Sequence, residues 1–453
     1  MGQAHIVPLF DDICGMKKAP GYLALRVSCT NFARFWSGLW RQPAAVAAPF
    51  SRGLPTTMRS KMTLFLPATL GLLTAFGPFV TDFYLPVLPE MAEYFHTSPA
   101  LVSMSLTTGM FGLAAGQVFI GPLTDKYGRR HILLGSMLLF AVASALCIWS
   151  TNIFMFNVCR LFQGIAGAGG IVISKSMATD LYSGHDLARF MAILGAINGI
   201  APVSAPVVGG LVSAVTSWQG IFGVLMAIGL VLLVCCAILR ETLSPEMRIH
   251  KNILGIYANL FRVFRNPTFT LSALGEMLCH FTLFGYISAS PFILQQVYGL
   301  SPLRFSLCFA INALAIGVGS VLGARFRRTS ASLRFGAIFM LVATLCLGMG
   351  LNLHLSLLVV MPFYVCTLAG FGLLQPGLTS TALDSERHNA GAASAIYGAS
   401  AFLAGALVSP VVTMGRIELT SSVVMTLGAV VCLLLSLALA RRLANLTNNS
   451  SPF

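Results

Sequence analysis

Charged side chains are scarce in this sequence. They make up 9% of its 453 residues, whereas a soluble globular protein carries roughly 25%. So few charges cannot cover a water-soluble particle of this size. The remaining environment is lipid, where a spanning helix needs about 20 mostly apolar residues. The composition therefore excludes a soluble globular protein and predicts a membrane protein.

Motifs of catalysis and metal binding are also missing. The apolar runs contain no H-E-x-x-H or G-x-S-x-G pattern and no His/Asp cluster at metal-ligand spacing. The eleven cysteines are scattered without a C-x-x-C pair, which is typical of small buried hydrophobic residues. A repeated selectivity filter or rings of like charge would indicate a channel, and neither is present. We therefore expect no enzyme, no channel, no metal and no cofactor.

Apolar runs of spanning length occupy most of the chain. They lie at 63–88, 99–121, 132–150, 153–174, 188–211 and 218–239, and then at 268–293, 303–324, 334–353, 356–381, 390–413 and 419–440. We predict an all-α membrane protein whose twelve transmembrane helices form two related six-helix bundles, at 62–239 and 268–441. A cytoplasmic linker at 240–267 joins the bundles, and 442–453 is a cytoplasmic tail.

The net charge of +14 is distributed unevenly among the loops. If the first span begins in the cytoplasm, cytoplasmic loops and the C-terminal end hold 17 of the 28 Lys and Arg, whereas external loops hold two. This asymmetry predicts that both termini are cytoplasmic. The basic residues form no stripe with interleaved aromatics, so we expect no nucleic-acid partner.

Residues 1–61 differ from the rest of the chain. They hold eight basic and two acidic residues and no spanning run. The segment Tyr22–Trp40 is mildly amphipathic and could lie on the membrane surface. We interpret 1–61 as a basic extension that is disordered or non-native, with Met58 or Met62 as the functional start.

Four ionisable residues lie within the spans: Asp82, Arg160, Glu276 and His280. Such residues are costly in lipid and are functional candidates. Asp82 and Arg160 each lie roughly 10 Å below the external edge, so they could pair across a cavity and couple transport to protons; the alternative is a fixed ion pair. Glu276 and His280 are one helical turn apart. They are either a second ionisable site or a hydrated acid beside an interior histidine.

The fifth predicted span is rich in glycine and proline. Its small or helix-bending residues are Gly195, Gly199, Pro202, Pro206, Gly209 and Gly210. Proline bends a helix and glycine permits close approach of a neighbour. This span could be a rocking element, and simple close packing is compatible with that role.

Several motifs resemble those of the major facilitator superfamily. Gly121-Pro-Leu-Thr-Asp125-Lys-Tyr-Gly128-Arg129-Arg130 looks like the loop 2–3 motif, and Arg160-Leu-Phe-Gln163-Gly164-Ile-Ala-Gly167 is similar to the fourth-span motif. Ala201–Gly210 looks like a drifted antiporter motif. More narrowly, Thr81–Pro86, Ser288–Phe292 and Tyr298–Pro302 resemble the bicyclomycin/chloramphenicol resistance subfamily of drug:proton antiporters.

The resemblance implies a two-lobed fold that opens alternately to each side of the bacterial inner membrane and exports small amphiphilic compounds in exchange for protons. Asp82 and Arg160 would belong to the proton-coupling region, and the proton gradient would supply the energy. The cytoplasmic latch would comprise Gly121, Asp125, Gly128, Arg129 and Arg130. We expect a substrate cavity lined by Tyr84, Gln163, Asn198, Phe292, Asn312 and Tyr397 in a monomer.

Two positions depart from the family pattern. The second copy of the latch motif, Ala324–Arg328, has no acidic residue, and Thr74 stands where some relatives carry a second acid in the first span. A symmetric latch and a two-proton mechanism are therefore not expected. A proton-coupled carrier of a metabolite such as a sugar, an amino acid or a siderophore has the same motifs and stays open as an alternative.

Overall fold

A computed structural model describes residues 56–248, 257 and 260–449. The expectations for 1–55, including the amphipathic segment Tyr22–Trp40, lie outside the described residues. Every regular element in the described ranges is a helix. Eleven helices are long and apolar enough to cross a membrane, and one bent pair brings the number to as many as twelve. The predicted all-α membrane fold is confirmed.

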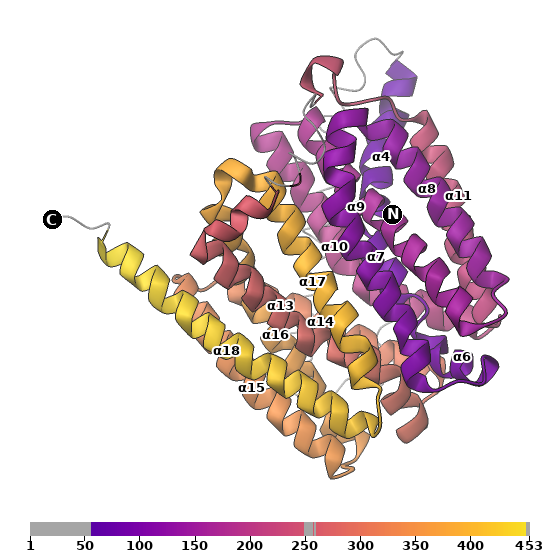
Figure 1. The fold of residues 1–453 in the computed structure, drawn as a ribbon, viewed down its shortest axis with the longest axis vertical. Coiled ribbons are helices and arrows are strands. Elements are labelled where there is room, and N and C mark those ends of the chain that lie inside the picture. The colour runs from indigo at the N-terminus through magenta and orange to yellow at the C-terminus, as the bar shows by residue number, and fades with distance from the viewer. Residues whose placement is uncertain (1–55, 249–256, 258–259, 450–453) are drawn as a thin grey trace.

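The first half of the chain forms one bundle, drawn from indigo to magenta in Figure 1. Its elements are α4 (Thr56–Thr74), α5 (Phe76–Asp82), η1 (Leu85–Val87), α6 (Leu88–Tyr94), α7 (Pro99–Tyr127), α8 (Arg129–Ile148), α9 (Ile153–Leu181), α10 (Gly184–Ser213) and α11 (Trp218–Ile238). The connection to the second half contains η2 (Pro245–Met247) and η3 (Phe261–Arg265). We call the end of the molecule that carries this connection the linker end, and the opposite end the α6 end.

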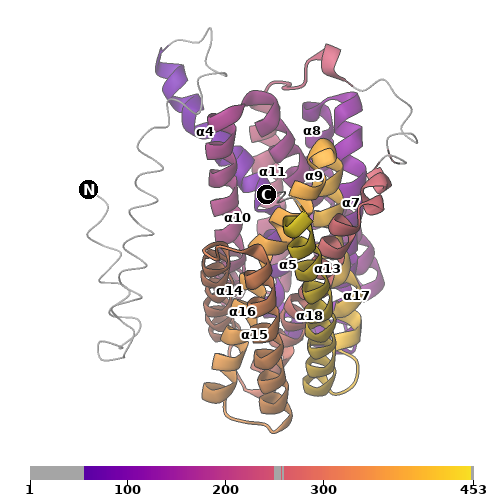
Figure 2. The ribbon, with the colours of Figure 1, turned by 90° about the vertical axis from the view of Figure 1, so that its left-hand side faces the viewer.

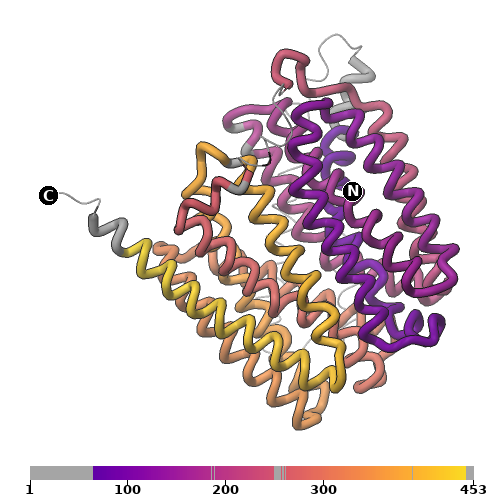
Figure 3. The backbone as a smooth tube through the Cα atoms, in the orientation of Figure 1, coloured from indigo at the N-terminus to yellow at the C-terminus, as the bar shows by residue number. Residues whose placement is uncertain are grey.

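The second half forms the other bundle, drawn from salmon to yellow (Figures 1 and 3). Its elements are α13 (Pro267–Phe292), η4 (Ile293–Val297), α14 (Pro302–Ala324), α15 (Thr329–Asn352), α16 (Leu357–Ser385), η5 (Arg387–Asn389), α17 (Ala390–Val412) and α18 (Ile417–Asn449).

The same packing pattern occurs in both bundles. In the first, α9 lies between α7 and α8, and α8 also packs on α11; in the second, α16 lies between α14 and α15, and α15 also packs on α18. Between the bundles, α7 packs on α17 and α10 packs on α14, and Figure 2 shows α10 reaching down to α14. Exchanging the halves converts one of these contacts into the other, so the bundles are related by a pseudo-twofold arrangement.

Close helix contact explains two glycines at the interface of α7 and α9. A Cβ at Gly112 of α7 would meet the carbonyl oxygen of Leu161, and one at Gly164 of α9 would meet that of Gly109. Lipid tails are as apolar as the helix surfaces, so the hydrophobic effect does not drive helices together within a membrane. Their association depends on such close packing of small residues. In the second half, Gly319 of α14 lies against the backbone of Ala369 in the same way.

The first span is broken, whereas the sequence predicted one continuous run at 63–88. The axis bends by 42° between Phe65–Thr74 and Phe76–Tyr94. Pro78 has no N–H for the carbonyl of Thr74, and Pro86 has none for the carbonyl of Asp82, so the helical ladder is interrupted at both places. Asp82 therefore lies at the end of a short helix, followed by η1 and α6.

Helices also extend beyond several predicted ends. α4 begins at Thr56, inside the predicted extension, and contains Met58 and Met62. α9 continues to Leu181, beyond the predicted span at 153–174. Lys175, one of the 17 Lys and Arg counted in cytoplasmic loops, therefore lies within a helix. Polar residues near the ends of long helices hid these extra turns in the hydropathy pattern.

Candidate functional site

Asp82 is a buried carboxylate at the break in the first span. Asp82 is 4% exposed, and its Oδ1 accepts a hydrogen bond from the Thr81 hydroxyl at 2.7 Å. The Thr81 hydroxyl also approaches the carbonyl of Gly77 at 3.1 Å. A buried carboxylate needs donors or a cation in place of water, and the structure gives Asp82 one hydroxyl.

Arg160 lies fully buried in α9, with 0% exposure. Its Nη2 donates to the carbonyl of Val80 at 2.6 Å, and its Nη1 donates to Oε1 of Gln163. The guanidinium carbon is 4.4 Å from the ring centroid of Tyr84 and 5.8 Å from that of Phe222, which adds cation–π attraction. Nε has no hydrogen-bond partner among the described residues.

The partners of Arg160 extend this polar cluster to two more helices. The Gln163 amide donates to the Ser144 hydroxyl of α8 at 2.7 Å, and the hydroxyls of Tyr84 and Ser105 of α7 are 2.9 Å apart. A guanidinium with its donors held in a fixed fork can orient several groups at once. The Arg160 cluster thus joins five elements of the first half: the first span, α7, α8, α9 and α11.

The predicted ion pair between Asp82 and Arg160 is not formed in this conformation. Both side chains are described, and no N···O contact within 4.0 Å joins them. The matching depth is nevertheless present, because Arg160 binds the carbonyl of Val80, two residues before Asp82. Arg160 is occupied by a carbonyl and an amide, and Asp82 turns to its neighbour Thr81.

Glu276 and His280 lie together in α13, as their spacing predicted. His280 Nδ1 is 3.4 Å from the Glu276 carboxylate and 2.9 Å from its carbonyl oxygen. Glu276 is 3% exposed, so the interpretation as a hydrated acid near the surface is wrong for this conformation. Its other oxygen accepts from Gln375 of α16 at 3.2 Å, and the hydroxyl of Tyr397 of α17 also interacts with it. One of the predicted cavity residues thus joins the predicted second ionisable site.

The other predicted cavity residues are mostly covered in this conformation. Tyr84, Gln163, Phe292 and Asn312 are at most 1% exposed, whereas Asn198 of α10 is exposed. The Asn312 amide donates to the hydroxyl of Tyr286 at 3.0 Å, within the second half. Their role as a lining of the substrate cavity stays a prediction.

The latch motif forms the turn between α7 and α8, with Gly128 at φ 96°. Glu241, three residues after α11, places its carboxylate on this turn and accepts from the backbone N–H groups of Arg129 at 2.9 Å and Arg130 at 3.1 Å. A Cβ at Gly128 would crowd that carboxylate. Glu241 therefore neutralises the N-terminus of α8, where the helix dipole favours an anion.

Hydrogen bonding sets the pKa of Glu241. Burial alone would raise it, but the backbone N–H groups of Leu243, Arg129, Arg130 and Thr242 outweigh burial and hold the pKa below its usual value. The carboxylate is thus ionised at neutral pH.

The arginines of the latch bind within the first half. Arg129 pairs with Asp125 and, through Nε, with Asp180 of α9 at 3.1 Å, and it donates to the Thr124 hydroxyl at 2.7 Å. Arg130 donates to the carbonyl of Ala237 at 2.8 Å. Gly121 lies one turn before Asp125 in α7. In this conformation the motif therefore joins α7, α8, α9 and α11 rather than the two halves.

The glycines of α10 separate into two groups. A Cβ at Gly209 would meet the carbonyl of Phe83, and one at Gly210 would meet Ser306 of α14 in the other half. A Cβ at Gly195 or Gly199, nearer the linker end, would have no described residue within 4 Å. Pro202 and Pro206 lie between the groups, inside the helix.

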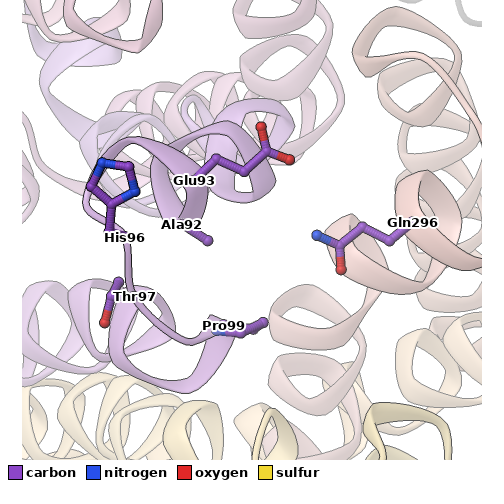
Figure 4. Close-up of a pocket in the computed structure, with 6 residues that line it drawn as sticks. All are labelled: Ala92, Glu93, His96, Thr97, Pro99 and Gln296. Atoms are coloured by element: carbon purple, nitrogen blue, oxygen red, sulfur yellow. The ribbon is translucent and has the colours of Figure 1, made fainter.

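The two halves are closed at the α6 end. The Gln295 amide of η4 donates to the carbonyl of Pro86 of η1 at 3.1 Å. Gly210 of α10 and Ser306 of α14 form a second close contact between the halves. A cavity of about 480 Å³ lies on the same seam, lined by Ala92, Glu93, His96, Thr97, Pro99 and Gln296. Figure 4 shows the amide of Gln296 pointing from the second half toward the loop that follows α6. Toward the linker end, α10 packs on α4 through Ile197 and Gly71.

Sequence reasoning missed two acidic partners, Asp180 and Glu241, which hold the latch. Their positions just past the apolar runs were the available signal. Among the described residues, no three His, Cys, Asp or Glu side chains gather in a metal-binding group.

Comparison with known proteins gives a consistent result. A model of the family described as Major Facilitator Superfamily matches residues 70–410. A Bacillus subtilis protein named uncharacterized MFS-type transporter YdgK is 37% identical over 78% of this chain and 89% of its own length. A Haemophilus influenzae protein named bicyclomycin resistance protein homolog is 28% identical over 82% of this chain and 95% of its own. The solved structure of a D-xylose–proton symporter superposes with a TM-score of 0.65 at 18% identity, covering 82% of this chain and 96% of the symporter.

Proposed function

This chain belongs to the major facilitator superfamily, and we propose that it exports small amphiphilic compounds across the bacterial inner membrane in exchange for protons. The relative named for bicyclomycin resistance supports drug export. The distribution of Lys and Arg supports a cytoplasmic linker end and cytoplasmic termini. The chain would act as a monomer without a cofactor, and the proton gradient would supply the energy.

The observation that carries the proposal is the arrangement of Asp82 and Arg160. The acid is buried with one hydroxyl donor, and the guanidinium binds the backbone two residues away. A protonated Asp82 has no charge to neutralise and can keep the Thr81 hydroxyl as its only hydrogen-bond donor. An ionised Asp82 would attract Arg160 away from the Val80 carbonyl, because a charged pair is stronger than a charge–carbonyl bond in a low-dielectric site.

Such an exchange of partners would act where the first span is broken. The carbonyl of Val80 belongs to α5, and its release would free the short segment of η1 and α6 that holds the α6 end closed through Pro86. Opening of that end on proton release and closing on proton uptake is alternating access. Glu276 and its partners in the second half form a second ionisable site that could also contact substrate.

Everted membrane vesicles test this proposal. Asp82→Asn keeps the size of the side chain and removes its charge, so proton-driven substrate accumulation should be abolished while the amount of protein in the membrane is unchanged. Asp384→Asn is the matched control, because Asp384 is 65% exposed and pairs with Arg387 on the surface. Wild-type accumulation by the Asp82 variant, or accumulation by the wild type that an uncoupler leaves intact, would refute proton coupling through Asp82.

A further inference from the structure

Four arginines gather at the turn between α14 and α15 on the linker end. Arg325, Arg327, Arg328 and Arg334 are all exposed, and none forms an ion pair with a described residue. Arg327 and Arg328, together with Phe326 and Ala331, line a cavity of about 530 Å³. The turn thus presents a hollow with a high density of uncompensated positive charge.

The equivalent turn of the first half is neutralised by the protein itself. There Arg129 pairs with Asp125 and Asp180, and Glu241 occupies the N-terminus of α8. In the second half, α15 has no acid in its first turn and no capping side chain. The acid at the end of α16, Asp384, is paired with Arg387. The turn between α14 and α15 therefore has the positive charge of an anion site, but no described carboxylate of the protein neutralises it.

Apolar side chains lead away from this hollow along the outside of α15. The ring of Phe326 lies 5.9 Å from that of Phe335, which lies 6.0 Å from that of Phe339. Further along the helix, Phe335, Ile338, Val342 and Leu345 are each at least 50% exposed. Their spacing of three and four residues places them on one face. In a membrane protein this face contacts hydrocarbon.

We propose that the turn binds an anionic phospholipid from the leaflet at the linker end. Arg327 and Arg328 bind its phosphate, since guanidinium matches phosphate oxygens in a bidentate geometry. An acyl chain lies along the Phe335 face of α15. A free phosphate would use the arginines alone, whereas the lipid uses the charged hollow and the adjoining apolar face together.

Native mass spectrometry of the purified full-length protein tests the site with phosphatidylglycerol as the anionic probe and phosphatidylcholine as the zwitterionic one. An arginine near an anionic lipid surface contributes about 1 kcal/mol, so Arg327→Gln with Arg328→Gln should weaken phosphatidylglycerol binding about 30-fold. The matched control is Arg262→Gln with Arg265→Gln, which removes the same charge from exposed positions in η3. The control should bind as the wild type does.

A second arm separates the lipid from its headgroup. Glycerol 3-phosphate in excess should fail to displace phosphatidylglycerol, and Phe335→Ser should weaken lipid binding while leaving the arginines in place. Equal loss in both double variants would overturn the proposal in favour of general surface charge. Full competition by glycerol 3-phosphate, or unchanged binding in the Phe335 variant, would overturn the phospholipid as the ligand.

Discussion

Removal of the Glu241 carboxylate should loosen the first half at the linker end. The carboxylate accepts four backbone N–H groups, two of which begin α8. Loss of a helix cap costs about 0.5–2 kcal/mol, and loss of an anion at a helix N-terminus costs about 0.3–1 kcal/mol more. We therefore expect Glu241→Ala to destabilise the protein by about 2 kcal/mol. Glu241→Gln should cost about 1 kcal/mol, because the amide oxygen still accepts hydrogen bonds.

The effect should depend on pH. The folded-state pKa of Glu241 is lowered, so its stabilisation is complete above the pKa of the unfolded chain and is lost as the pH falls through the folded-state pKa. The difference between wild type and Glu241→Gln should thus be largest near pH 7 and shrink below about pH 4.5.

Thermal unfolding in detergent, followed by the circular dichroism of the helices, provides the assay, because every regular element in the described ranges is a helix and this signal can be read at pH 7 and at pH 4 alike. For a unit of 150–250 residues, 1 kcal/mol corresponds to about 2–4 °C, so Glu241→Ala should lower Tm by about 4–8 °C if the first half unfolds as a unit. Glu246→Gln, at an exposed position in the same connection, is the control. An unchanged Tm for Glu241→Ala, or a Tm difference that persists undiminished at pH 4, would refute this account of α8.

Two further changes test packing and charge geometry. Gly164→Leu should prevent assembly of the first half, because its side chain would meet the backbone of α7; size-exclusion chromatography should show aggregated protein, and Gly135→Leu, on an open face of α8, should elute normally. Arg160→Lys keeps the charge but cannot hold the Val80 carbonyl and Gln163 in one planar fork. It should therefore lower transport in vesicles at normal expression, and full activity would indicate that charge alone matters.

Hydropathy predicted the spans because each crossing must satisfy its backbone inside lipid, and only a long apolar helix does so. The same averaging concealed the break in the first span. The signal was present as Pro78 and Pro86, each of which removes an N–H from the ladder. A window of 20 residues measures apolarity and does not register a missing hydrogen bond.

Depth in the membrane predicted that Asp82 and Arg160 approach each other, but it could not predict their partners. An arginine has five donors, and a backbone carbonyl or an amide competes for them with a carboxylate. The choice depends on rotamers that packing decides. The same limit applies to Glu276, whose partners Gln375 and Tyr397 come from two other helices about 100 residues away or more in sequence.

The small residues of α10 fall into two groups that differ in what surrounds them. Glycine inside a helix is about 1 kcal/mol less favourable than alanine. At Gly209 and Gly210 the close packing of neighbours offsets that cost, because Phe83 and Ser306 occupy the space that a side chain would need. Gly195 and Gly199 have no such neighbour among the residues that the structure describes. Under the proposed alternating access, closure of the linker end would offset their cost by bringing a neighbouring helix onto this stretch, with Pro202 and Pro206 between the two groups.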